Sequence, residues 1–113
     1  MFLDSAKLAE MDSERFRSTR PYPWANPAGL LTRQGFDKLV EQLPDVSRFK
    51  PVFGRSRKHG QQAHDRYALE WHEGLPLGDA WNAFIEELRG QEYRGFLTRM
   101  IGHDRFSLKF HFH

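Results

Sequence analysis

The strongest constraint on the fold is the strict alternation of apolar and polar residues over positions 106–113, FSLKFHFH. In an extended chain, residues of one parity share one face, and here one of the two faces is entirely apolar. The apolar face holds Phe106, Leu108, Phe110 and Phe112, and the polar face holds Ser107, Lys109, His111 and His113. The pattern predicts a β-strand over 106–113 that buries its aromatic face.

A strand this apolar needs neighbouring strands and a layer over its aromatic face. A second strand is predicted over 66–72, where Tyr67, Leu69 and Trp71 share one face. Because a two-stranded sheet is marginal in water and an open edge invites pairing, more sheet is expected. Either the chain is the N-terminal part of a longer domain, or a partner such as a second copy in a homodimer covers strand 106–113.

Helical periodicity appears in three segments, which predict helices over 33–43, from about 79 to 90, and over 91–101. In the first, Phe36, Leu39, Val40 and Leu43 have helical spacing, and Thr32 is expected to cap the helix. Asp79 is the expected cap of the second. Gly90 and Gly102 are the expected stops of the second and third helices. The fold class is therefore α+β, with three helices and two or three strands.

The remaining segments are predicted to be less regular. The N-terminal segment, residues 1–20, is expected to hold one short helix that begins after Asp4 or Ser5. Three prolines in PYPWANP favour an extended strap, with Tyr22 and Trp24 anchored on a core. Residues 45–65 contain Pro51, Gly54 and Gly60 and are expected to be irregular.

Composition limits the class of protein. A chain of 113 residues with 39% hydrophobic and 14% aromatic residues is sized for one folded domain and is not typical of disorder. No apolar run approaches the roughly 18 residues of a membrane span, and no signal-peptide core precedes the domain. Cysteine is absent, which excludes disulfides. We therefore expect a soluble cytoplasmic protein that does not bind membranes.

The excess positive charge is concentrated in residues 48–66, where six lysines and arginines face Asp65 alone. Such a stretch can attract phosphates or carboxylates, although a solvated loop has the same composition. The candidate anion-binding residues are Arg55, Arg57, Lys58, His59 and Arg66. Binding of nucleic acid is disfavoured, because the net charge is only +2 and the aromatic face of 67–71 is expected to be buried.

No motif of the sequence identifies a catalytic site. His111 and His113 form an H-x-H pair that can place two imidazoles on one ion, but no third ligand accompanies them, so no metal site is predicted. His59 and His64 beside Asp65 are expected to tie the loop to the strand through hydrogen bonds. Phosphate loops, nucleophile elbows and H-E-x-x-H motifs are absent from the sequence.

A series of short segments between about Tyr22 and His113 resembles a known family. The segments, in chain order, are Tyr22-Pro23-Trp24, Gly29-Leu30-Leu31-Thr32, Leu43-Pro44-Asp45-Val46-Ser47, His59-Gly60-Gln61, His64-Asp65-Arg66-Tyr67 and Phe110-His111-Phe112-His113. Their order and spacing resemble the N-terminal region of bacterial 2-oxoglutarate- and Fe(II)-dependent oxygenase-like proteins. The resemblance implies that residues 21–113 are the N-terminal part of a single oxygenase-like domain.

In that family, helices support the outside of a double-stranded β-helix, or jelly roll, and an H-x-D motif and a later histidine hold the iron. The resemblance thus implies Fe(II) and 2-oxoglutarate as cofactors of a hydroxylase. The H-x-D motif does not occur in this sequence, so no catalytic residue is transferred and activity of the chain alone is not expected. The first strands of the jelly roll would be present and the sheet would be incomplete.

Two other functional classes stay open. One is a non-enzymatic interaction module that forms a homodimer through the open strand 106–113. The other is a binder of anionic ligands or nucleic acid that uses the basic stretch 48–66.

Overall fold

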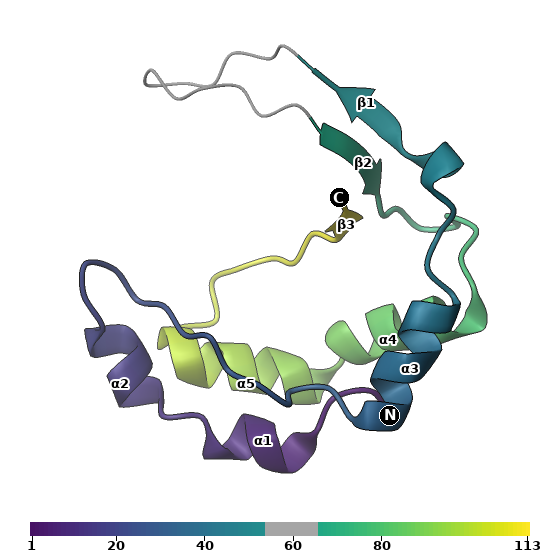
Figure 1. Ribbon diagram of the computed structural model, residues 1–113. Helices are drawn as coiled ribbons and strands as arrows, with labels where there is room; N and C mark the ends of the chain where they lie inside the picture. The colour runs from purple at the N-terminus through teal and green to yellow at the C-terminus, as the bar shows by residue number, and fades with distance from the viewer. Residues whose placement is uncertain (54–65) are drawn as a thin grey trace. The chain divides into compact units, whose positions relative to one another are not determined.

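The computed structural model describes residues 1–53 and 66–113, which form an α+β fold (Figure 1). In this part of the chain there are five α-helices, one 3₁₀ helix and a three-stranded antiparallel sheet. They divide into a helical unit, Met1–Leu43 with Leu77–Ser107, and a sheet unit, Pro44–Pro76 with Leu108–His113. The α+β class is confirmed, whereas a jelly-roll arrangement stays a prediction from the resemblance.

The N-terminal segment holds two short helices where the sequence predicted one. Helices α1 (Ser5–Glu10) and α2 (Ser13–Ser18) each follow an aspartate cap. The Asp4 carboxylate accepts from the amide of Lys7 at 3.2 Å, and the Asp12 carboxylate accepts from the amide of Arg15 at 3.0 Å. The start after Asp4 is confirmed, and Asp12 gives the same capping signal for the helix that was missed.

Helix α3 (Arg33–Glu41) begins as predicted, because the Thr32 hydroxyl accepts from the amide of Gly35 at 3.1 Å. Its predicted apolar face is only partly covered. Leu39 is buried, whereas Phe36, Val40 and Leu43 are each about half exposed. Phe2 packs closely against the helix at Gly35, where an added Cβ would lie 2.9 Å from the Cα of Phe2.

The predicted cap of the second helix was wrong by one position. Asp79 is the first residue of α4 (Asp79–Leu88), and Gly78 is its cap. Gln42 takes over the capping by accepting from the amide of Ala80 at 2.9 Å. Gly90 directly follows Arg89, the C-cap of α4, as predicted for a helix stop, and in an extended conformation it is also the N-cap of α5 (Gln91–Ile101). Gly102 ends α5 as predicted, with a left-handed φ of 92°.

The core of the helical unit joins segments that are distant in sequence. Phe2, Leu39 and Ala80 form a buried cluster, and Leu31, Trp81 and Phe84 pack against it. The indole of Trp81 donates to the carbonyl of Leu39 at 3.0 Å. The Glu87 carboxylate accepts from the amides of Phe2 and Leu3 at 2.9 and 2.8 Å. The first residues of the chain are therefore a structural part of this unit.

Two arginines of α5 hold neighbouring backbone. Arg99 donates to the carbonyls of Leu8 and Met11, both at 2.7 Å, at the end of α1. Arg94 donates to the carbonyl of Phe106 at 3.2 Å, and its guanidinium lies 4.4 Å from the centre of that ring. Because Phe106 is held in this way within the helical unit, it takes no part in a strand.

The sheet has the order β1-β2-β3, with β1 (Lys50–Val52), β2 (Arg66–Glu70) and β3 (His111–Phe112). The predicted strand 66–72 is confirmed over Arg66–Glu70, and residues 71 and 72 lie outside it. The prediction of an irregular 45–65 was wrong at β1, whose pairing with β2 is a tertiary effect, and at the 3₁₀ helix Val46–Arg48. The predicted strand 106–113 was too long, because β3 comprises His111–Phe112, with one further backbone bond from the amide of Trp71 to the carbonyl of Phe110 at 2.9 Å.

One face of the sheet unit is aromatic. Ring pairs join Phe49 with Phe112 at 6.3 Å and Trp71 with Phe110 at 5.8 Å. The predicted alternation holds, since Phe106, Leu108, Phe110 and Phe112 are half-buried and the residues between them are exposed. Tyr67 was predicted to be buried but is 53% exposed, and it packs against Phe53, which is exposed too. Leu69 is the buried residue of this face.

Candidate functional site

The opposite face of the sheet carries the charged residues. The register pairs Lys50 with Ala68 and Val52 with Arg66, and paired residues in antiparallel strands point to the same side. Glu70 has the same parity as Ala68 and Arg66, so it lies on this side as well. Strand pairing thus places two cations and one carboxylate on one surface, although they come from separate parts of the sequence.

A cavity of about 410 Å³ lies over this surface. Its lining comprises four polar and four apolar residues, namely Lys50, Arg66, Glu70 and His72 with Val52, Ala68, Leu69 and Leu75. Small-molecule sites combine an apolar surface with a few convergent polar groups, and this lining has both. We therefore take the cavity as the candidate functional site, and we call it the β1–β2 cavity.

Arg66 is the unusual residue of the β1–β2 cavity. Its Nε is buried and has no hydrogen-bond partner in the part of the chain that the structure describes. A buried donor without an acceptor costs about 1–3 kcal/mol, so such atoms are rare unless an acceptor arrives from elsewhere. Within the same residues, Lys50 and Glu70 form no ion pair, and both are exposed.

The structure describes one residue of the predicted anion-binding set, and anion binding by the set stays a prediction. Arg66 lies in the β1–β2 cavity, whereas Arg55, Arg57, Lys58 and His59 lie outside the described residues. The cavity adds Lys50, Glu70 and His72, which sequence analysis did not assign to a site. Lys50 was visible as part of the basic stretch, and only the strand register reveals that it shares a face with Arg66.

His111 and His113 lie on the polar face of their strand, as predicted, and both are exposed. Their ring centres are 4.4 Å apart, and His111 pairs in register with Glu70. Among residues 1–53 and 66–113, no group of three or more His, Cys, Asp or Glu side chains is placed to hold a metal ion. These residues therefore do not fit the iron site that the resemblance implies, and we assign no step of iron chemistry to them.

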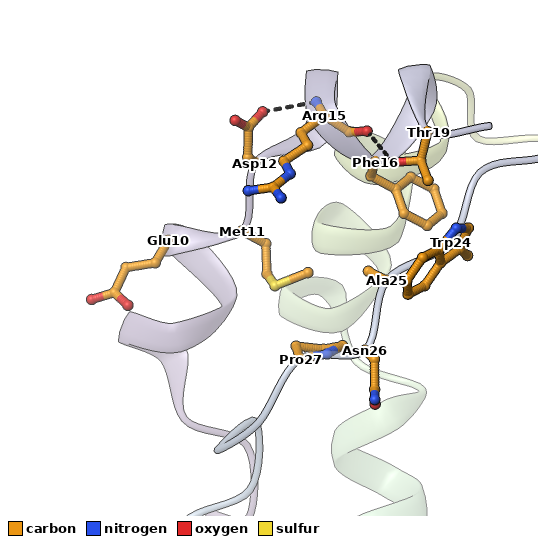
Figure 2. Close-up of a pocket in the computed structure, with 10 residues that line it drawn as sticks. All are labelled: Glu10, Met11, Asp12, Arg15, Phe16, Thr19, Trp24, Ala25, Asn26 and Pro27. Atoms are coloured by element: carbon orange, nitrogen blue, oxygen red, sulfur yellow. Dashed lines mark hydrogen bonds between the residues drawn. The ribbon is translucent and has the colours of Figure 1, made fainter.

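A second cavity, of about 370 Å³, lies in the helical unit among α1, α2 and residues 24–27 (Figure 2). Trp24 lines it and is 52% exposed, while Tyr22 is 67% exposed, so the prediction that both anchor the strap on a core was wrong. The polar groups here serve the helices. Asp12 caps α2, and the Thr19 hydroxyl donates to the carbonyl of Arg15 at 2.6 Å.

Among the titratable groups of residues 1–53 and 66–113, those with shifted pKa values are Asp45 and Tyr93, and both lie outside the two cavities. The side chain and then the amide of Ser47 hold the pKa of Asp45 below its ordinary value, because both stabilise the carboxylate. The hydrogen bond from the Ser47 amide to the Asp45 carboxylate is 2.9 Å long. Burial raises the pKa of Tyr93, since desolvation disfavours the phenolate. Neither group has a partner that suggests acid–base catalysis.

Comparisons with known proteins found no matching family model, no matching curated protein and no matching solved structure. The resemblance to oxygenase-like proteins therefore rests on the short segments of the sequence. Among the described residues, no helix has the length and apolar character needed to cross a lipid bilayer.

Proposed function

We propose that this chain provides the helical support and the first strands of a 2-oxoglutarate- and Fe(II)-dependent oxygenase-like domain. The observation that carries the proposal is the ordered series of family-like segments from Tyr22 to His113. Two features of the sheet unit support it. β3 is an edge strand, and the aromatic residues beside it are only half-buried, as expected for strands that continue into a larger sheet.

The coding sequence that follows His113 tests the proposal directly. We expect an in-frame H-x-D motif within about twenty codons, which is the length of one strand and its connections. A following sequence without this motif would overturn the proposal. An enzymatic test uses the 113-residue protein with Fe(II), 2-oxoglutarate and oxygen. We expect no succinate above a metal-free control, and succinate formation would show that the chain holds an iron site other than an H-x-D motif.

A homodimer is the second candidate, and the open edge of β3 favours it. Two copies that pair along this edge would cover their half-buried aromatic residues. Light scattering over a range of concentrations decides between the candidates, because a dimer gives twice the monomer mass above its dissociation constant. A monomer at all concentrations whose β3 amides are protected from hydrogen exchange would exclude the dimer.

A further inference from the structure

We propose that the β1–β2 cavity binds the carboxylate of a small organic acid that carries a short apolar tail. The inference uses only residues of the sheet unit and does not depend on the oxygenase resemblance. It begins from the lining of the cavity, in which basic and apolar side chains meet over about 410 Å³. Cavities of about 300–1,000 Å³ are typical of small-molecule sites.

Arg66 determines which chemical group is bound. Its buried Nε lacks an acceptor among the described residues, so an incoming oxygen would satisfy a donor that the fold has already removed from water. A guanidinium presents Nε and one Nη side by side, at a spacing that matches the two oxygens of a carboxylate. The expected contact is therefore a pair of parallel hydrogen bonds from Arg66 to one carboxylate.

Lys50 provides the second positive charge. It pairs with Ala68, which places it diagonally across the two strands from Arg66 and on the same face. Diagonal neighbours on a sheet are about 7–8 Å apart, a distance that a lysine side chain spans easily. Lys50 is exposed, so it can move toward an anion held by Arg66 without losing an ion pair to the described residues.

The remaining lining selects the class of acid. Lys50 and Arg66 together with Glu70 leave one net positive charge in the cavity, which suits a monoanion. A doubly charged phosphate would be repelled by Glu70 and would find too few donors. Val52 and Ala68, which share the face of Arg66, and Leu75 give the apolar surface on which a short hydrocarbon tail would pack.

A titration followed by NMR tests the proposed ligand class. The ¹⁵N-labelled 113-residue protein is titrated with 3-methylbutanoate, and the amide signals of Val52, Ala68 and Leu69 are followed. We expect saturable shifts at these amides. 3-Methylbutanamide has the same shape without the charge and should bind at least about tenfold more weakly, because it lacks the charge-assisted bonds. Equal affinity for the amide, or tighter binding of inorganic phosphate, would overturn the proposal.

Three variants test the assigned residues. Arg66→Gln should weaken binding of 3-methylbutanoate by at least about tenfold. Arg66→Lys keeps the charge but loses the paired guanidinium donors, so its affinity should lie between those of the wild type and Arg66→Gln. Arg48→Gln is the matched control, because it removes one charge from the same basic stretch but does not line the cavity. Its affinity should stay within about twofold of the wild type.

Glu70→Gln gives a test of opposite sign, which also holds if Arg66→Gln does not fold. Removal of the carboxylate leaves the cavity more positive, so 3-methylbutanoate should bind several-fold more tightly. Unchanged binding in Arg66→Gln, or weaker binding in Glu70→Gln, contradicts the assignment of the two residues.

Discussion

The helical unit and the sheet unit contain similar kinds of apolar residue but bury them to different extents. Of the buried hydrophobic residues in the described part, all but Leu69 belong to the helical unit, and they are Phe2, Leu3, Leu8, Leu39, Ala80, Ile85 and Met100. The sheet unit arranges its aromatic rings in edge-to-face pairs on a half-covered face. A high content of aromatic residues therefore does not by itself produce a buried hydrophobic core.

The difference in burial follows from the kind of interactions that stabilise each unit. In the helical unit, side chains bond backbone groups far away in sequence, as Glu87 does at Phe2 and Gln42 at Ala80. These hydrogen bonds hold Phe2 and Ala80 in place in the buried cluster with Leu39. The sheet unit is held by three short strands and by ring contacts, and among the described residues Leu69 is its one buried hydrophobic side chain. We expect stability to be concentrated in the helical unit and binding capacity in the sheet unit.

The largest effect is expected from truncating one buried leucine in each unit. Leu39→Ala should lower the free energy of unfolding by about 2–5 kcal/mol, because it opens a cavity in the closed cluster. Leu69→Ala should cost less, about 1–2 kcal/mol, since its half-exposed surroundings can collapse into the space. Urea denaturation measures both. Val40→Ala, at a position that is 48% exposed, is the control, and a larger loss in Leu69→Ala would reverse the comparison.

A pair of glycine variants sharpens the account of the helical unit. Gly35→Ala should destabilise by about 1–3 kcal/mol, because the new Cβ would lie 2.9 Å from the Cα of Phe2. Gly95→Ala should stabilise by about 0.5–1 kcal/mol, since α5 has open space there and alanine favours helix. Thermal melts of both variants give the sign, and a stabilising Gly35→Ala would disprove the close approach of Phe2.

Two adjacent glutamates of α4 test whether the N-terminus is fastened to the helical unit. Glu87→Gln should cost about 1–2 kcal/mol, because the amides of Phe2 and Leu3 lose their charged acceptor. Glu86→Gln should cost under about 0.5 kcal/mol, because it loses only an exposed ion pair with Arg89. Hydrogen exchange at the Leu3 amide should accelerate in the first variant alone. Similar exchange in both variants would remove Glu87 from this role.

The smallest effect concerns Asp45 at the start of the 3₁₀ helix. Its lowered pKa means that its contribution to stability is present above the ordinary value of 3.8 and is lost as the pH falls through the folded value. Ser47→Ala should raise the pKa of Asp45 part of the way to its ordinary value. The shift is only partial because the hydrogen bond from the backbone amide of residue 47 remains. A carboxyl NMR titration measures this, and an unchanged pKa would contradict the hydroxyl contact.

Elements whose signals are local could be predicted from the sequence. Thr32 and Gly102 mark helix ends through their own side chain and backbone, and both predictions are confirmed. β1 could not be predicted, because the three residues around Pro51 become a strand only when β2 lies beside them. In the candidate site, Arg66 was found from its charge. Glu70 and His72 were not, since no spacing in the sequence relates them to Lys50.

The sequence by itself determined the α+β class, the start of α3, the end of α5 and the alternating aromatic ribbon near His113. These features follow from the backbone preferences and periodicity of neighbouring residues, which act within one turn or one strand. Only the tertiary structure decided that Phe2 enters the core, that Trp24 stays exposed and that Lys50 joins Arg66. Each of these depends on which distant segments pack together. The free energy of that packing depends on all the segments involved, so no single stretch of the sequence predicts it.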